Sequence, residues 1–211
     1  EDKQIIKKRI FSSASPDKNI VENNKNIFGK LYTPIKVKEL INNKWLCPII
    51  PRTFEYNEKT DLSYWISTEF DKLESNYGFS FHNLDDNAFE LFYSHCNKFI
   101  RDNTNIKPYL LIDINGLSDI NKEKLEYIKK ELNYKFTDIE CFEKNIKSLG
   151  YTVKQFDTGY DFSKLDFIVF SDSTQSDKKI IQCIGRGTRP DGDGKDGKNL
   201  NKKLNIMLPV Y

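Results

Sequence analysis

Three side chains suited to binding a polyphosphate lie close together near the end of the sequence. Gln182, Arg186 and Arg189 are spaced by four and three residues, so a helix would place them on one face. A guanidinium group can donate two parallel hydrogen bonds to phosphate oxygens, and it keeps its charge at neutral pH. The pattern therefore predicts a helix that presents two arginines to a phosphate-rich ligand.

Two glycines interrupt the same segment. Gly185 and Gly187 each cost a helix about 1 kcal/mol relative to alanine, which predicts that another group approaches the helix backbone closely. Two arginines before a glycine-rich loop are also typical of a solvated helix end. The rest of the chain has to decide between these two interpretations.

The elements that would position this segment alternate between strands and helices. A short helix is expected from about 33 to 43, because Thr33 and Pro34 suit its start. Gly150 suits the end of a later helix. Apolar runs or alternation predict strands at 45–50, 109–114, 151–156, 165–170 and 205–210, and apolar residues recurring at three and four predict helices at 85–101, 121–132, 138–149 and 178–189. The alternation predicts an α/β fold with a mainly parallel central sheet flanked by helices.

Length and composition limit the class of protein. The 211 residues allow one large domain or two small ones, and 38% hydrophobic with 13% aromatic residues is too apolar for a disordered chain. No stretch is long and apolar enough for a membrane span. The four cysteines lack metal-ligand or disulfide spacing, which favours reduced thiols in an intracellular protein. His82 and His95 have no partner at ligand or catalytic-triad spacing and are expected to be structural or surface residues.

The charged residues carry a second kind of information. A net charge of +2 does not by itself indicate a nucleic-acid binder. Lysine outnumbers arginine by 28 to 5, and together with abundant Asn and Ile this indicates the coding bias of an A/T-rich genome. Because the sequence begins at Glu1 rather than Met, we expect it to be a piece of a longer chain.

Several segments together resemble the superfamily 2 helicases (DEAD/DEAH-like). The pattern Gln-x-x-Gly-Arg-x-x-Arg from Gln182 to Arg189 resembles helicase motif VI, and residues 157–161 with the strand up to 172 resemble motif V. Residues 12–16, Ser-Ser-Ala-Ser-Pro, are similar to motif III, which ends the first of the two RecA-like domains of that family. Residues 32–50 look like the usual entry into the second RecA-like domain, and residues 208–210 resemble its final strand. The order and spacing are right from residue 10 to residue 211.

The resemblance implies a domain organisation. Residues 1–32 would be the tail of the first RecA-like domain with a connector. Residues 33–211 would be the second, C-terminal RecA-like domain, with an insertion at about 52–106 and a motif IV strand at 110–115. The style of the motifs is most similar to helicases of large DNA viruses.

The resemblance also implies roles for individual residues. Arg189 would be an arginine finger that stabilises charge on the γ-phosphoryl group of ATP, which is worth on the order of 10³–10⁵ in rate in well-studied NTPases. Arg186 would be a second contact to the triphosphate, and Gln182 would orient groups around it. The other implied sites are nucleotide contacts at Gly159, Asp161 and Gly185, a nucleic-acid phosphate contact at Thr158, and interdomain coupling at Ser13, Ala14 and Ser15.

Cofactors and partners follow from the same resemblance. The sequence contains neither a phosphate loop nor an acidic box, so ATP and Mg²⁺ would be bound mainly by an upstream domain, and this piece alone should not hydrolyse ATP. The expected partners are nucleic acid, with DNA favoured over RNA, and the first RecA-like domain of the parent chain. No metal site of its own and no membrane contact are expected. The location would be intracellular, in the cytoplasm or nucleus of a host cell or in the virion if the protein is viral.

Two other functions stay open on the sequence. The chain could be a catalytically inert helicase-like module that binds nucleic acid or a protein partner as a scaffold. It could also belong to a translocase that remodels a complex and never unwinds a duplex.

Overall fold

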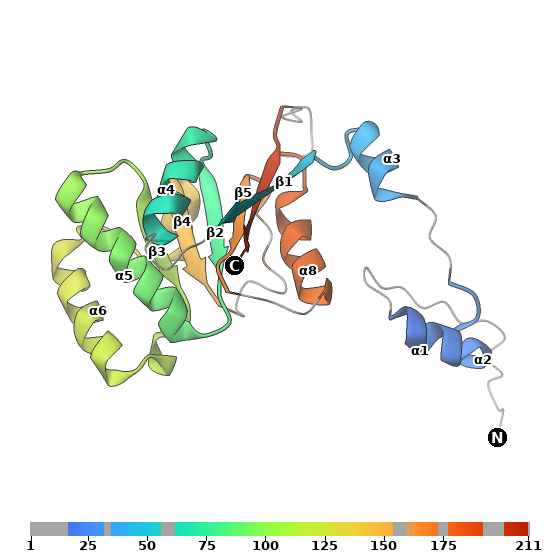
Figure 1. Cartoon of the computed structure of the whole chain (residues 1–211), viewed down its shortest axis with the longest axis horizontal. Helices are drawn as coiled ribbons and strands as arrows, with labels where there is room; N and C mark the ends of the chain where they lie inside the picture. Colours follow the sequence, from blue (N-terminus) through green and yellow to red (C-terminus); the bar gives the residue numbers. More distant parts are fainter. Residues whose placement is uncertain are drawn as a thin grey trace, which may run out of the picture.

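The computed structural model describes residues 17–31, 35–55, 62–153, 160, 162–172, 177–191 and 201–210. Six strands form one sheet in the order β1-β6-β5-β2-β4-β3, and every neighbouring pair is parallel. The strands are β1 (Ile49–Glu55), β2 (Tyr77–Phe81), β3 (Lys107–Leu111), β4 (Ser148–Thr152), β5 (Phe167–Phe170) and β6 (Leu204–Val210). The predicted α/β fold with a parallel central sheet is confirmed (Figure 1).

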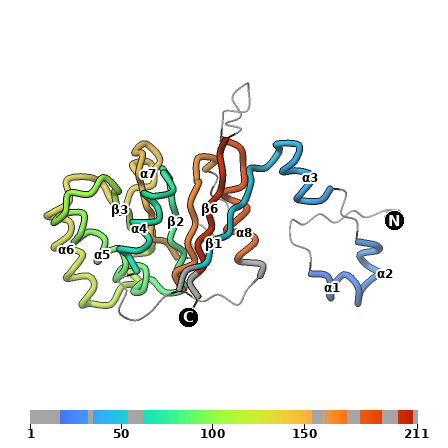
Figure 2. The backbone as a smooth tube through the Cα atoms, turned by 45° about the horizontal axis from the view of Figure 1, so that its top comes forward, coloured from blue at the N-terminus to red at the C-terminus, as the bar shows by residue number. Residues whose placement is uncertain are grey.

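Helices alternate with the strands along most of the chain. They are α1 (Lys18–Asn23), α2 (Lys25–Phe28), α3 (Val37–Asn42), α4 (Leu62–Lys72), α5 (Asp85–Asp102), a 3-10 turn η1 (Ile114–Gly116), α6 (Asp119–Glu131), α7 (Ile139–Lys144) and α8 (Asp177–Gly187). The tube in Figure 2 lets the reader follow β1 and β6, which come from distant parts of the chain and pair side by side. None of the described helices is long and apolar enough to cross a membrane.

The sheet is buried on both faces. Helices α4, α5 and α6 contribute to one apolar cluster, whereas α7 and α8 contribute to the other. Strand β5 shows the division, because Phe167 and Val169 belong to the first cluster, and Ile168 and Phe170 to the second. A strand covered on both faces needs apolar residues at every position. This is why the run at 165–170 could be predicted as a strand. The run at 109–114, expected to be a central strand, is instead the edge strand β3.

The segment expected to be an insertion, at about 52–106, contributes β2 to the middle of the sheet. Strand β2 lies between β5 and β4, and α4 and α5 on either side of it in sequence pack on one face of the sheet. Its aromatic residues Tyr77, Phe79 and Phe81 alternate and lie in one cluster. The intervening Gly78 and Ser80 broke the apolar run. The alternation was the signal that could have predicted this strand. Whether residues 52–106 form an insertion relative to helicases stays a prediction.

Gly150 was predicted wrongly. Helix α7 ends at Lys144, and β4 starts at Ser148, so Gly150 lies in the middle of a strand rather than after a helix. A Cβ atom there would lie 2.8 Å from Leu111 Cδ1 and 2.9 Å from Phe79 Cδ1. Close packing between neighbouring strands therefore explains this glycine.

Other element boundaries moved by smaller amounts. The predicted strand at 109–114 is β3, which ends at Leu111 and is followed by η1, where the Asp113 side chain accepts a hydrogen bond from the amide of Asn115 at 3.0 Å. The strand predicted at 45–50 begins at Ile49. Residues 17–28, expected to be a connector, contain α1 and α2.

Candidate functional site

The helix predicted to carry the phosphate-binding side chains is α8, between β5 and β6 in the sequence. Cys183 on this helix is buried in the second cluster, while Gln182 and Arg186 are half-buried. The helix ends at Gly187, two residues earlier than predicted. Arg189 therefore lies in the turn beyond the helix, where it is exposed.

The two glycines of α8 differ in what surrounds them. A Cβ atom on Gly187 would overlap Leu204 Cδ1 and lie 2.8 Å from Leu204 Cδ2, so the helix lies this close to β6 because Gly187 has no side chain. A Cβ atom on Gly185 would meet no described atom within 4 Å. Packing within the fold thus explains the close approach predicted at Gly187. At Gly185 the backbone is open to an approaching group.

Arg186 joins α8 to the segment before β5. Its Nη1 atom donates a hydrogen bond to the carbonyl of Tyr160, 26 residues away in sequence. The Tyr160 hydroxyl in turn donates to Glu143 Oε1 on α7 at 2.8 Å. Tyr160 lies between Gly159 and Asp161 in the segment that resembles motif V. The motif VI-like helix and the motif V-like segment are therefore in direct contact.

The other predicted site residues cannot be placed in the same way. They lie outside the described residues, and their roles stay predictions: Ser13, Ala14, Ser15, Thr158, Gly159 and Asp161.

The turn after α8 is held by the segment that leads into β1. The amide of Cys47 donates to the carbonyl of Thr188 at 2.8 Å, and its Sγ donates to the carbonyl of Gly187 at 3.3 Å. Leu204, the neighbour of Gly187, is the first residue of β6. The end of α8, with Arg186 and Arg189, therefore lies on the side of the sheet where the strands β1 and β6 begin.

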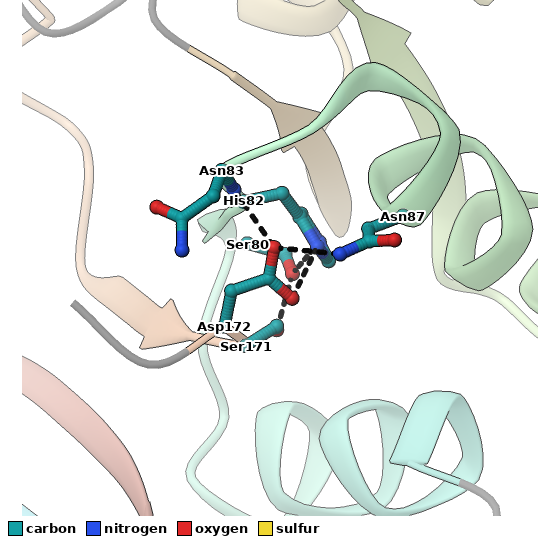
Figure 3. A network of polar contacts seen from close by, with 6 residues as sticks. All are labelled: Ser80, His82, Asn83, Asn87, Ser171 and Asp172. Carbon is teal, nitrogen blue, oxygen red and sulfur yellow. Dashed lines mark hydrogen bonds and ion pairs between the residues drawn. The ribbon is translucent and has the colours of Figure 1, made fainter.

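A second polar cluster lies on the opposite side of the sheet, at the carboxyl ends of β2 and β5 (Figure 3). The Oγ of Ser80 lies 2.8 Å from His82 Nε2 and 2.7 Å from Ser171 Oγ. His82 Nδ1 lies 3.7 Å from Asp172 Oδ1. Ser80 is fully buried and shares its hydroxyl with Ser171, so it does not present a nucleophile despite the Ser-His-Asp composition. The cluster instead ties β2 to β5.

Asp172 is the charged centre of this cluster. One of its oxygens accepts a hydrogen bond from the amide of Asn83 at 2.8 Å and another from Asn87 Nδ2 at 3.1 Å. Burial raises the pKa of Asp172, but the interactions with His82, Asn83 and Asn87 together outweigh burial and lower the pKa to about 2. The carboxylate is therefore ionised at neutral pH and stabilises the folded chain.

This cluster was not predicted from the sequence, although both histidines were expected to have a structural or surface role. His82 is buried in it, and His95 is buried with its Nδ1 2.8 Å from the Tyr151 hydroxyl. Spacing gave no sign of a partner because Asp172 is far from His82 in sequence. The available signal was topological: polar residues that end two parallel strands meet at one edge of a sheet. Among the described residues, no group of three or more His, Cys, Asp or Glu could hold a metal ion.

The sequence matches no protein-family model, and no curated protein matches it. Among solved structures, the chain is similar to a fragment from Vibrio vulnificus YJ016 described as an HsdR subunit of a type I restriction enzyme. The TM-score is 0.59 at 17% identity, and the match covers 93% of this chain and 38% of that chain. The chain thus spans well under half the length of that protein. At this identity the match shows a shared fold.

Two further structures match more weakly. The ATP-dependent type ISP restriction-modification enzyme LlaBIII bound to DNA has a TM-score of 0.49 and 13% identity, covering 89% of this chain and 14% of that chain. The Mycobacterium smegmatis helicase Lhr bound to ssDNA and AMP-PNP has a TM-score of 0.45 and 12% identity, covering 77% and 19%.

We expect the two glycines of α8 to respond oppositely to alanine. Gly187→Ala should lower the free energy of unfolding by about 1–3 kcal/mol, because the new methyl group overlaps Leu204. Gly185→Ala, the matched control, should leave it unchanged or raise it by up to about 1 kcal/mol, since alanine favours a helix. Urea unfolding measures both. Equal effects of the two substitutions would contradict the packing described for α8.

We also expect a pH-dependent contribution from Asp172. Because its pKa of about 2 lies below its ordinary value of 3.8, Asp172→Asn should cost about 2 kcal/mol of stability at pH 7. The stabilising contribution is present above pH 3.8 and is lost as the pH falls toward 2, so wild type and variant should converge there. Glu140→Gln, at a side chain that is 77% exposed, serves as the control and should change little. A difference between wild type and Asp172→Asn that does not vary with pH would contradict this role.

Proposed function

We propose that the chain is the C-terminal half of an ATP-dependent superfamily 2 helicase or translocase that acts on nucleic acid. The observation that carries the proposal is the hydrogen bond from Arg186 to the carbonyl of Tyr160. Two segments that resemble separate helicase motifs in the sequence are in contact in space. If the two arginines only formed a solvated helix end, the alternative interpretation of the sequence, this contact would not be required.

The chemistry of the proposal depends on charge. Hydrolysis of ATP develops negative charge on the transferred phosphoryl oxygens, and an arginine placed beside them lowers the barrier. Arg189 is exposed in the turn after α8. From there it would contact a triphosphate bound by another domain. Arg186 lies one turn earlier and is fixed by Tyr160. Gln182 lies a further turn back and would orient groups around the phosphates.

The surroundings of Gly185 fit this arrangement. Its backbone has open space where a side chain would be, in contrast to Gly187, which the fold itself fills. A nucleotide or the facing domain could approach the helix there. The first RecA-like domain of the parent chain would bind Mg²⁺ and make most of the contacts to ATP. Ser13, Ala14 and Ser15, at the end of that domain, would make contacts between the two domains.

The domain boundaries, the remaining contact residues, the substrate and the source are inferred from the sequence resemblance. Residues 1–32 would end the first domain, and residues 33–211 would form the second. Thr158 would contact nucleic-acid phosphate, while Gly159 and Asp161 would contact the nucleotide. DNA is the proposed substrate, and a large DNA virus the proposed source. The structural match to an HsdR fragment supports the fold assigned to this half.

We expect Arg189→Ala to lower ATP turnover by the full-length protein that contains this chain to a small residual rate. Turnover should be stimulated by DNA or RNA in wild type and should fall by about 10³ or more in the variant, the scale of an arginine finger. The measurement is steady-state phosphate release with no nucleic acid, with DNA and with RNA. Arg101→Ala is the matched control, because Arg101 is an exposed arginine paired with Asp102 at the end of α5.

Other results lead to different conclusions. Turnover that survives in Arg189→Ala would contradict the role of Arg189. No turnover in wild type, with nucleic-acid binding retained, would replace the enzyme by the scaffold function. Turnover without strand separation would favour a translocase.

A further inference from the structure

Lys202 is a buried lysine directed at the end of α8. The residue is only 7% exposed. Its Nζ atom donates hydrogen bonds to the carbonyl of Arg189 at 2.8 Å and to the carbonyl of Ser163. A buried ammonium group is costly unless its protons are bound. Lys202 therefore has a specific task at this position, and its principal partners are backbone carbonyls.

The charges around Lys202 explain how it is tolerated. Burial lowers the pKa of Lys202, and the negative charge of its neighbours Asp166 and Asp191 opposes that shift. Asp166 itself accepts hydrogen bonds from the amides of Asn76 and Tyr77 at the start of β2. The ammonium group is thus held between the end of α8 and the starts of the central strands.

Three consecutive carbonyls, that of the last residue of α8 and the two that follow, accept hydrogen bonds from outside the helix. The carbonyls of Gly187 and Thr188 accept hydrogen bonds from Cys47, and the carbonyl of Arg189 accepts one from Lys202. The last carbonyls of a helix lack partners within it, and a positive charge near them is favourable. Lys202 supplies that charge at the residue whose guanidinium would reach ATP.

Lys202 is also fixed to the sheet. It comes two residues before Leu204, whose amide donates to the carbonyl of Pro48 at 2.9 Å, just before β1. Its hydrogen bond therefore connects the backbone of Arg189 to the frame of β1 and β6.

We propose that Lys202 is a positioning residue that holds the turn of Arg189 in place for ATP hydrolysis. This inference rests on the proposed function of Arg189. Misplacing a catalytic group by about 1 Å can cost on the order of 10²-fold in rate. Loss of Lys202 should therefore lower kcat strongly and change KM for ATP little, because the upstream domain makes most contacts to the nucleotide.

The first test measures kcat and KM for ATP in the full-length protein. Lys202→Met should lower kcat by about 10–100-fold, and Lys202→Arg should restore most of it. Lys203→Met changes an exposed neighbouring lysine and should have no effect. Lys202→Gln, which keeps an N–H donor without the charge, replaces Lys202→Met if the latter lowers the folded fraction.

A double-mutant cycle separates positioning from general stabilisation. If Lys202 acts through Arg189, Lys202→Met should cause no further loss of kcat in the Arg189→Ala background. A lysine that only stabilises the fold would lower turnover by the same factor in both backgrounds. That result would overturn the inference. A normal kcat in Lys202→Met, with turnover lowered to a small residual rate in Arg189→Ala, would overturn it as well and would leave the proposed function intact.

Amide hydrogen exchange tests whether Lys202 holds the turn if the wild-type protein shows no turnover or if Arg189→Ala retains turnover. In Lys202→Met, the amides of Cys47, Thr188 and Arg189 should exchange with solvent about tenfold faster than in wild type or Lys203→Met, because a hydrogen bond from a charged group has been lost from this turn. Faster exchange would then confirm that Lys202 holds the turn, although the proposed function has failed. Unchanged exchange would overturn the inference about Lys202 itself.

Discussion

The close packing of Gly187 on Leu204 determines where α8 lies, and the candidate site depends on it. A side chain at this position would overlap Leu204, so that α8 or Leu204 would have to shift. A shift of α8 would disturb the hydrogen bonds of Cys47 and Lys202 to the turn that follows, and also the contact of Arg186 to Tyr160. The absence of a side chain at Gly187 thus allows the close packing on which the positions of Arg186 and Arg189 depend.

Strand β5 connects the two polar regions of the molecule. Asp166, just before the strand, accepts hydrogen bonds from the start of β2, and Asp172, just after it, accepts them from the end of β2. Burial outweighs the favourable hydrogen bonds of Asp166 and raises its pKa to about 6, whereas the hydrogen bonds of Asp172 outweigh burial. Both ends of β5 are therefore fixed to its neighbour.

The sequence predicted those parts of the fold in which local pattern and burial agree. Strands β3, β5 and β6 were found because apolar runs suit a sheet buried on both faces, and α5 and α6 because their apolar residues recur on one side. Strand β2 was missed and Gly150 misassigned, since small residues there make room for aromatic side chains of neighbouring elements. For the site, the face of α8 was predictable from spacing. The partners His82–Asp172 and Lys202–Arg189 were not, because each pair is joined only by the topology of the sheet.

The role of Arg189 is tested by a structure of the full-length protein with ADP and a fluoride analogue of the transferred phosphoryl group. We expect the Arg189 guanidinium to lie at hydrogen-bond distance, about 2.7–3.2 Å, from the fluoride ligands, with Arg186 beside the nucleotide phosphates and still bonded to Tyr160. An analogue bound in the upstream domain with Arg189 directed away from it would contradict this role.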